Sequence, residues 1–246
     1  MGIDENFRIE YGEIVKKMAE QAEKDKDVFL PNPEPEGPVN YVLICMEPSL
    51  GRWARSREEA AAKVKKGFRN FLPSDETSIL HFSIRRYLCG PSERYHITDL
   101  SKGAMHVGRA SEKRIDRWNR WYPLLQDEIK LVGPNARIIA VGRQVSRFLL
   151  NRGDFGRLFD VTHYSSLAGA ARSAGIRRHE AEFESFKDSV SKEDLTATAQ
   201  HFLASARVPQ EIRKETLEQL EKFQLTYSRQ KLMFIYKLAF EKIRSD

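Results

Sequence analysis

The pattern of apolar and polar positions divides the chain into short apolar runs and longer segments with helical spacing. Four runs bounded by glycine, proline or polar residues predict strands at 41–45, 95–100, 137–142 and 159–162. The first, Tyr41–Cys45, is apolar throughout, which indicates a central strand covered on both faces. Helices are predicted at roughly 3–26, 57–71, 78–88, 111–131 and 144–150. Strands that alternate with helices indicate an α/β fold, with a four-stranded parallel sheet flanked by helices.

The ends of the chain have a different character from this predicted sheet. Residues 31–38 carry four prolines and a glycine, so they should form a stiff linker without regular structure. After residue 178 the pattern is wholly helical, with segments near 210–223 and 229–243. We therefore expect an N-terminal helix and proline-rich linker over 1–38, an α/β core over 39–178, and a helical extension over 179–246 packed on that core.

One predicted helix, at 111–131, has a clear amphipathic pattern. Five apolar side chains follow the spacing of one helical face and are expected to be buried: Ile115, Trp118, Tyr122, Leu125 and Ile129.

Composition adds a basic character to this picture. The chain has 246 residues and a formal net charge of +6. Seven Lys or Arg lie between Arg52 and Arg69, and eight Arg lie between Arg137 and Arg178. Such clusters are typical of phosphate contact, and solvated helix faces are the other interpretation.

The cysteines and the terminus limit the remaining classes of protein. Cys45 and Cys89 lie in apolar surroundings and lack the spacing of zinc or iron–sulfur ligands. The chain shows neither a signal peptide nor an apolar run of membrane-spanning length. We expect a cytoplasmic monomer without a metal, a cofactor or a membrane partner.

Three polar motifs follow predicted strands, where parallel sheets bind their ligands. They are Cys45-Met-Glu-Pro-Ser49, Ile97-Thr-Asp-Leu-Ser-Lys102 and Thr162-His-Tyr-Ser-Ser-Leu167. In order, spacing and placement they resemble the motifs of the uracil-DNA glycosylase-like superfamily, and Val141-Gly142 resembles its Leu-Gly element. The resemblance covers residues 39–170. It implies a metal-free, monofunctional DNA glycosylase that flips a base out of the DNA, hydrolyses its N-glycosidic bond and leaves an abasic site.

The resemblance assigns roles to particular residues. Glu47 matches the residue that activates water, and His163 matches the histidine that stabilises the departing base. Ser165 and Ser166 match phosphate-binding positions, and Leu167 matches the wedge that fills the gap in the base stack. Each has a plainer interpretation: a surface ion pair for Glu47, a structural histidine, and a loop leucine at a core edge. Further DNA contacts are expected at Lys102, Arg143 and Arg172.

Two departures from the superfamily bear on the base. Asp99 stands where an asparagine reads uracil, and either a protonated or an ionised carboxyl group suits a cytosine-type base better. A dry pocket shared with Glu47 would raise one carboxyl pKa enough to keep its proton. Ser49 stands where a tyrosine excludes C5 substituents. Asp99 as a simple turn residue is the other interpretation.

The aromatic residue that would stack on the base is left open among Trp53, Phe71 and Phe82. We expect Trp53 to take part in recognition of the base.

We therefore expect excision of a C5-modified cytosine from duplex or single-stranded DNA. Hydroxymethyl or glucosylated cytosine of phage DNA would fit, and would imply antiviral defence. A uracil or mismatch repair glycosylase and a non-catalytic DNA-binding module of the same fold are the alternatives. An α/β nucleotide- or nucleoside-processing enzyme has less support, because no glycine-rich phosphate loop is present.

Overall fold

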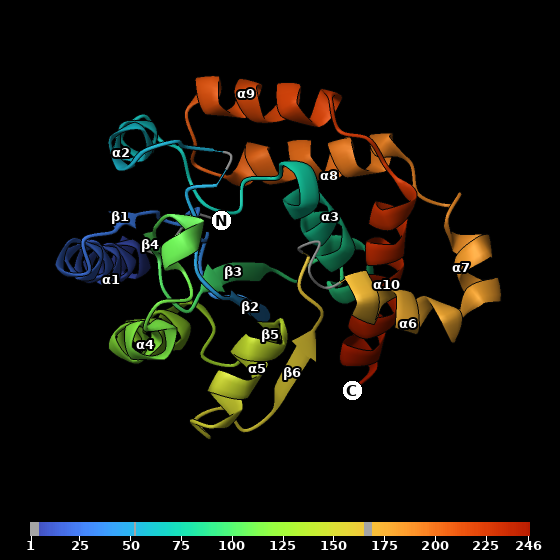
Figure 1. Ribbon diagram of the computed structural model, residues 1–246, viewed down its shortest axis with the longest axis horizontal. Coiled ribbons are helices and arrows are strands. Elements are labelled where there is room, and N and C mark those ends of the chain that lie inside the picture. The colour runs from blue at the N-terminus through green and yellow to red at the C-terminus, as the bar shows by residue number, and fades with distance from the viewer. Residues whose placement is uncertain (1–4, 52, 165–168) are drawn as a thin grey trace. The chain divides into compact units, whose positions relative to one another are not determined.

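The protein has an α/β fold built on a four-stranded parallel sheet. A computed structural model describes residues 5–51, 53–164 and 169–246. The strands are β2 (Tyr41–Cys45), β3 (Tyr95–Asp99), β5 (Arg137–Val141) and β6 (Leu158–Val161), and they lie in the order β3-β2-β5-β6 (Figure 1). The predicted fold class is confirmed.

The register of the central strands brings polar residues together at one edge of the sheet. β2 pairs in parallel with β3 and with β5, and Cys45 lies opposite Asp99. Every residue of β2 is buried, as its unbroken apolar sequence predicts. The residues that follow β2 and the last residue of β3 therefore lie beside each other.

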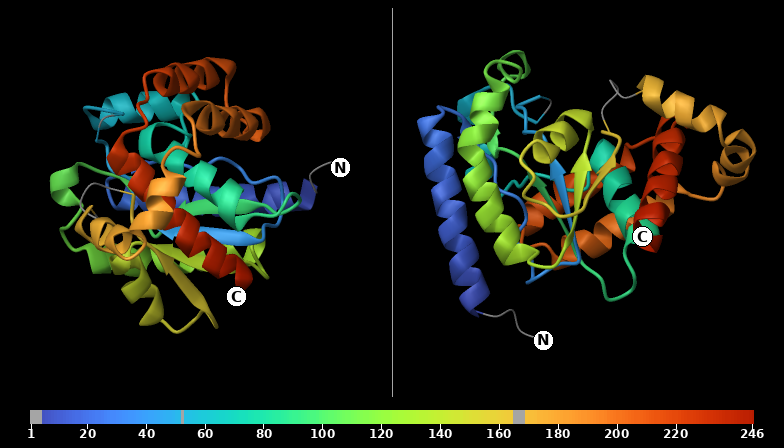
Figure 2. Two further views of the ribbon diagram at one scale, coloured as in Figure 1. Left: turned by 90° about the vertical axis from the view of Figure 1, so that its right-hand side faces the viewer. Right: turned by 90° about the horizontal axis from the view of Figure 1, so that it is seen from below.

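Helices cover one face of these strands. α1 (Glu5–Lys24) and α4 (Arg114–Val132) lie side by side (Figure 2), and α5 (Arg143–Leu150) follows β5 directly. Alternate residues of the strands, such as Val42 and Ile44, point into this layer. They pack in one apolar cluster with the helix residues Trp118, Tyr122, Leu125 and Phe148.

Three expected helices differ from the structure in detail. Ile115 is 54 % exposed, so its predicted burial is wrong. It is the second residue of α4 and lies before the first buried turn of that helix. α2 (Arg57–Lys65) stops short of residue 71, because Gly67 takes a positive φ of 103°. α3 (Asp75–Ser83) continues as a π-helix, Ile84–Leu88.

A second, two-stranded sheet was not predicted. β1 (Val28–Phe29) and β4 (Gly103–Ala104) pair antiparallel, with Val28 opposite Ala104. Two-residue strands carry no detectable alternation, so periodicity could not find them.

The chain forms two compact units, each discontinuous in sequence. The first comprises Met1–Asn70 and Arg94–Leu158, and the second Phe71–Glu93 and Phe159–Asp246. In the second unit, α10 (Tyr227–Ser245) contacts α3, the π-helix, α6 (Gly169–Arg177) and α7 (Glu180–Phe186). α8 (Lys192–Ser205) contacts α3 and α9 (Gln210–Glu221). The helical segments expected after residue 178 are therefore present.

The described helices include none with the length and apolar character needed to cross a membrane.

Candidate functional site

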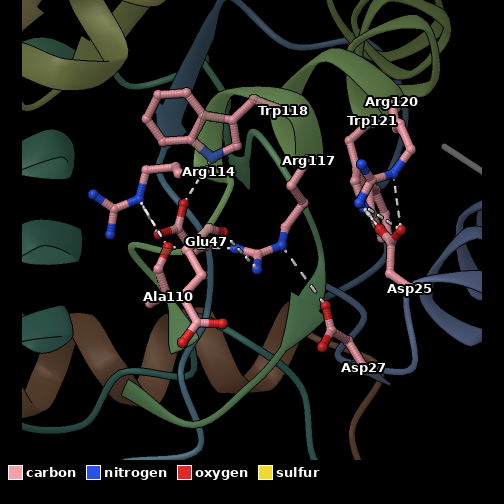
Figure 3. Close-up of polar contacts among 10 residues, drawn as sticks. Asp25, Asp27, Glu47, Ala110, Arg114, Arg117, Trp118, Arg120 and Trp121 are labelled. Atoms are coloured by element: carbon pink, nitrogen blue, oxygen red, sulfur yellow. Dashed lines mark hydrogen bonds and ion pairs between the residues drawn. The ribbon is translucent and has the colours of Figure 1, made fainter. Parts of the chain in front are cut away.

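Glu47 lies just beyond the end of β2 and is fixed by two donors from α4. Backbone hydrogen bonds from Leu100 to Cys45 and from Ser101 to Met46 continue the pairing of β3 with β2 as far as residue 46. The side chain of Glu47 is 3 % exposed. Its Oε1 accepts from Arg114 Nε at 2.8 Å, and its Oε2 accepts from Trp118 Nε1 at 2.7 Å (Figure 3). This ion pair is buried at the carboxylate end, so Glu47 is not an ordinary surface residue.

The surroundings of Glu47 favour a basic carboxylate. Burial raises its pKa above the ordinary value for a glutamate, and the hydrogen bonds and charge from Arg114 and Trp118 only partly offset this. A carboxylate has about four acceptor positions, and these donors occupy two of them. Glu47 can therefore still accept a hydrogen bond from a water molecule, and its raised pKa makes it a stronger base.

Asp99 is a second buried carboxyl group at the same edge of the sheet. It is the last residue of β3, and its Oδ2 accepts from Asn70 Nδ2 at 2.6 Å. Burial raises its pKa to about 8, because loss of hydration outweighs the nearby charge of Lys102, while the Glu47 carboxylate adds to the rise. At neutral pH Asp99 is therefore mainly protonated, as the sequence argument anticipated for one carboxyl group of this pair.

A buried polar network on β3 and α4 lies next to these carboxyl groups. Glu128 accepts from Thr98 at 2.7 Å and pairs with His96 at 3.0 Å and Lys102 at 3.0 Å. The pKa of Glu128 falls to about 2, because these partners outweigh the effect of burial. Asn32 donates to Thr98 at 3.2 Å from the segment after β1. The network ties β3 to the helix that holds Glu47.

α4 binds three acidic residues along one side (Figure 3). Arg114 and Trp118 bind Glu47. One turn after Arg114, Arg117 Nε lies 3.9 Å from Asp27 Oδ2. Arg120 Nε and Trp121 Nε1 both donate to Asp25, at 2.9 Å and 2.8 Å. One helix therefore supplies the polar partners of Glu47 and also those of Asp25 and Asp27, which lie in the turn between α1 and β1.

The structure contradicts the expected DNA contact of Lys102. Its side chain is 3 % exposed and forms a buried ion pair with Glu128. A lysine in that position cannot reach a phosphate without leaving an uncompensated buried carboxylate. Arg143 is placed differently: it is the first residue of α5 and is exposed.

Ser49 and Trp53 form a local structure after β2. Both are half-buried, and Trp53 Nε1 donates to the Ser49 carbonyl at 2.6 Å. The Trp53 ring stacks on Phe68 with centroids 4.9 Å apart. One face of the indole is therefore covered, which leaves at most the other face for a base.

His163 belongs to the second unit, where it follows β6. The Tyr236 hydroxyl of α10 donates to the carbonyl of Thr162 at 3.1 Å, and this bond fixes the backbone just before His163. The half-buried imidazole stacks on Tyr164 with ring centroids 4.3 Å apart. Ser165, Ser166 and Leu167 lie outside the described residues, as does the side chain of Arg172, whose backbone belongs to α6.

Phe71 and Phe82, the other stacking candidates, are both buried in the second unit. Phe71 has a φ of 51°, which is unusual for a bulky residue. Its carbonyl oxygen lies 2.7 Å from Nε2 of the buried His81, whose pKa burial lowers to about 4. His81 is therefore neutral, and a neutral imidazole can donate this hydrogen bond.

Three residues that position the carboxyl groups were missed in the sequence: Arg114, Trp118 and Asn70. Trp118 was assigned to the apolar face of its helix. A buried indole N–H needs an acceptor, so a polar partner for Trp118 could have been expected from the sequence. Arg114 lies four residues earlier, on the same side of α4. Asn70 left no periodic signal, because it follows the end of α2.

The described residues contain no group of three or more His, Cys, Asp or Glu side chains suited to a metal ion. Comparison with protein-family models, with curated proteins and with solved structures finds no match. The function is therefore inferred from the chemistry of the residues themselves.

Proposed function

We propose that the protein is a monofunctional DNA glycosylase that excises a cytosine-type base. The observation that carries the proposal is the pair of buried carboxyl groups at the ends of adjacent parallel strands. Glu47 is a strengthened base held by Arg114 and Trp118, and Asp99 keeps its proton at neutral pH. Two carboxyl groups whose surroundings give them different protonation states suit different tasks in one reaction.

In the proposed reaction, Glu47 orients and deprotonates the attacking water. Breaking the N-glycosidic bond leaves positive charge on the deoxyribose, and a nearby carboxylate stabilises that charge. The water oxygen bonds to C1′, its proton passes to Glu47, and the bond electrons leave with the base. His163 is proposed to donate a hydrogen bond to the departing base, by its likeness to the superfamily's histidine.

Asp99 supports a cytosine-type base over uracil. A protonated carboxyl group offers a hydrogen-bond donor to the base. Cytosine presents the matching acceptor at N3, whereas uracil presents a donor at N3. A serine instead of a tyrosine at position 49 would admit a C5 substituent, which fits a modified cytosine.

The proposal is tested with oligonucleotides that carry one uracil, cytosine, C5-methylcytosine, C5-hydroxymethylcytosine or glucosylated hydroxymethylcytosine. Each is incubated with the protein, and abasic sites are then cleaved with alkali. We expect cleavage at a cytosine-type base. If no oligonucleotide is cleaved while all are bound, the protein is a non-catalytic DNA-binding module.

Glu47→Gln provides the catalytic control for this assay. The amide keeps the shape of the side chain but cannot take a proton, so excision should fall about a hundredfold or more, with binding largely retained. Glu36→Gln, at a position in the proline-rich linker, is the matched control and should leave excision unchanged. Equal rates for Glu47→Gln and the unmodified protein would remove Glu47 from the mechanism.

A further inference from the structure

The contact between Asn70 and Asp99 extends the proposed site by one residue. The Asn70 amide nitrogen donates to Asp99 Oδ2 at 2.6 Å, slightly shorter than the usual range for such a bond. The Asn70 backbone N–H in turn donates to the Pro31 carbonyl at 2.9 Å. Asn70 is thus held by its main chain while its side chain orients the carboxyl group at the end of β3.

This orientation gives the two oxygens of Asp99 different tasks. Oδ2 accepts from Asn70, so the proton of the neutral carboxyl group belongs on Oδ1, which becomes a hydrogen-bond donor. The Asn70 amide oxygen has no hydrogen-bond donor among the described residues, and Asn70 is half-buried. Asp99 therefore supplies a donor, and the side chain that is hydrogen-bonded to it supplies an acceptor.

We propose that Asn70 and Asp99 together form a reading edge for a base with a ring nitrogen next to an exocyclic amino group. Asp99 Oδ1 donates to the ring nitrogen, and the Asn70 amide oxygen accepts from the amino group. This inference rests on the proposed function and adds a specificity-determining residue to it. The ligand class is an aminopyrimidine such as cytosine, read by two residues from separate chain segments.

The reading edge discriminates between cytosine and uracil because uracil would leave the Asp99 and Asn70 groups without hydrogen-bond partners. Uracil would set its N3–H against the Asp99 hydroxyl and its O4 against the Asn70 oxygen. Each mismatch leaves a donor facing a donor or an acceptor facing an acceptor, so uracil should bind at least about fivefold more weakly per mismatch.

The test is a double-change cycle. The amino group of the base and the Asn70 amide are removed separately and together, and binding is compared among the four combinations. Binding is measured in Glu47→Gln protein, which should not cleave its ligand, to single-stranded oligonucleotides with one cytosine or one 2-pyrimidinone, which lacks the amino group. The same pair of ligands is measured with Asn70→Ala added. We expect loss of the amino group to weaken binding about fivefold or more with Asn70 present and not at all with Asn70→Ala.

Asn119→Ala, an exposed position on α4, is the matched control and should show the same ligand preference as the Glu47→Gln parent. Thermal unfolding of each variant checks that it is folded, and Asn70→Ser repeats the test with a second replacement that lacks the amide. A merely structural role for Asn70 would weaken both ligands equally, which overturns the inference.

The two proposals can fail separately. If the unmodified protein excises a cytosine-type base but the cycle shows no coupling, the reading edge is wrong and the glycosylase proposal stands. If coupling is present but no base is excised, the reading edge stands and the catalytic proposal fails. Absence of binding to every oligonucleotide overturns both.

Discussion

A carboxyl group that is buried at the end of a strand keeps its proton because water no longer stabilises the charge. Asp99 meets this condition even with the Lys102 ammonium nearby, since Lys102 is bound to Glu128. The Glu47 carboxylate further discourages a second negative charge. The protonation state of this one residue therefore determines which hydrogen bonds the carboxyl group can make with a ligand.

This state should be visible in the pH dependence of excision. The donor at Asp99 is present below its pKa of about 8 and is lost above it. Excision of a cytosine-type base should therefore decline as pH rises through about 8, measured as kcat/KM under steady-state conditions. Asp99→Asn presents an amide donor at every pH and has no proton to lose, so it should remove this decline.

The same shift affects stability with a definite sign. In the unfolded chain an aspartate loses its proton near pH 3.9, whereas folded Asp99 retains it to about pH 8. The folded state therefore binds more protons across this interval, and the contribution of Asp99 to stability falls as pH rises from about 4 to 8. Asp99→Asn should melt at a higher temperature than the unmodified protein at pH 8 and lose that advantage near pH 4. A constant difference across this range would contradict the assignment.

At the level of helices and strands, α4 controls the chemistry of Glu47. The Arg114 and Trp118 donors both lower the pKa of the carboxylate against the effect of burial. Removing either donor should raise the Glu47 pKa further, because burial would act with less opposition. A base works only when it is deprotonated, so the loss of rate at low pH should then begin at a higher pH.

Arg114→Met and Trp118→Phe test this relation, with the acidic limb of the pH–rate profile as the measurement. Both should move that limb to higher pH. Arg120→Gln is the control, because Arg120 pairs with Asp25 and does not contact Glu47. A limb that stays in place in all three variants would show that the α4 donors do not set the basicity of Glu47.

The sequence revealed the strands better than the contacts made by their terminal residues. Apolar runs such as Tyr41–Cys45 are unfavourable in water, so strands at these positions and their burial in a parallel sheet could both be predicted. Glu47 and Asp99 could be predicted as strand-end residues for the same reason. Their partners could not, because Asn70 and Arg114 come from segments whose position depends on the tertiary fold.

Lys102 illustrates the same limit. Its charge and its place after a strand suggested a phosphate contact. A lysine near the end of a parallel strand can also point into the protein, where it can pair with a buried carboxylate. That carboxylate, Glu128, lies on α4 and is 1 % exposed. Sequence spacing alone gave no sign that these two residues would meet.

For the molecule as a whole, a net charge of +6 should assist association with a polyanion. Lys102 does not contribute to such a surface, and the exposed Arg143 remains as a candidate. If Arg143 contacts a phosphate, Arg143→Gln should reduce the salt dependence of binding to single-stranded DNA by about 0.7 in the slope of log K against log salt. Binding measured between low and moderate salt gives this slope directly.

Arg8→Gln is the control for this measurement, since Arg8 is engaged by Glu5 and Glu34 on the N-terminal side of the chain. Its slope should equal that of the unmodified protein. Equal slopes for both variants would place the phosphate contacts elsewhere.

The row of arginines and tryptophans on α4 also has a consequence for hydrogen exchange. Breaking the contacts of α4 would release Glu47, Asp25 and Asp27 at once, although these residues lie in two separate segments of the chain. The amide hydrogens of α4, of Leu100 and of Leu30, which donates to the Lys102 carbonyl, should therefore exchange through one shared opening. A ligand that binds at Glu47 should then slow deuterium uptake near residue 30, where it makes no contact.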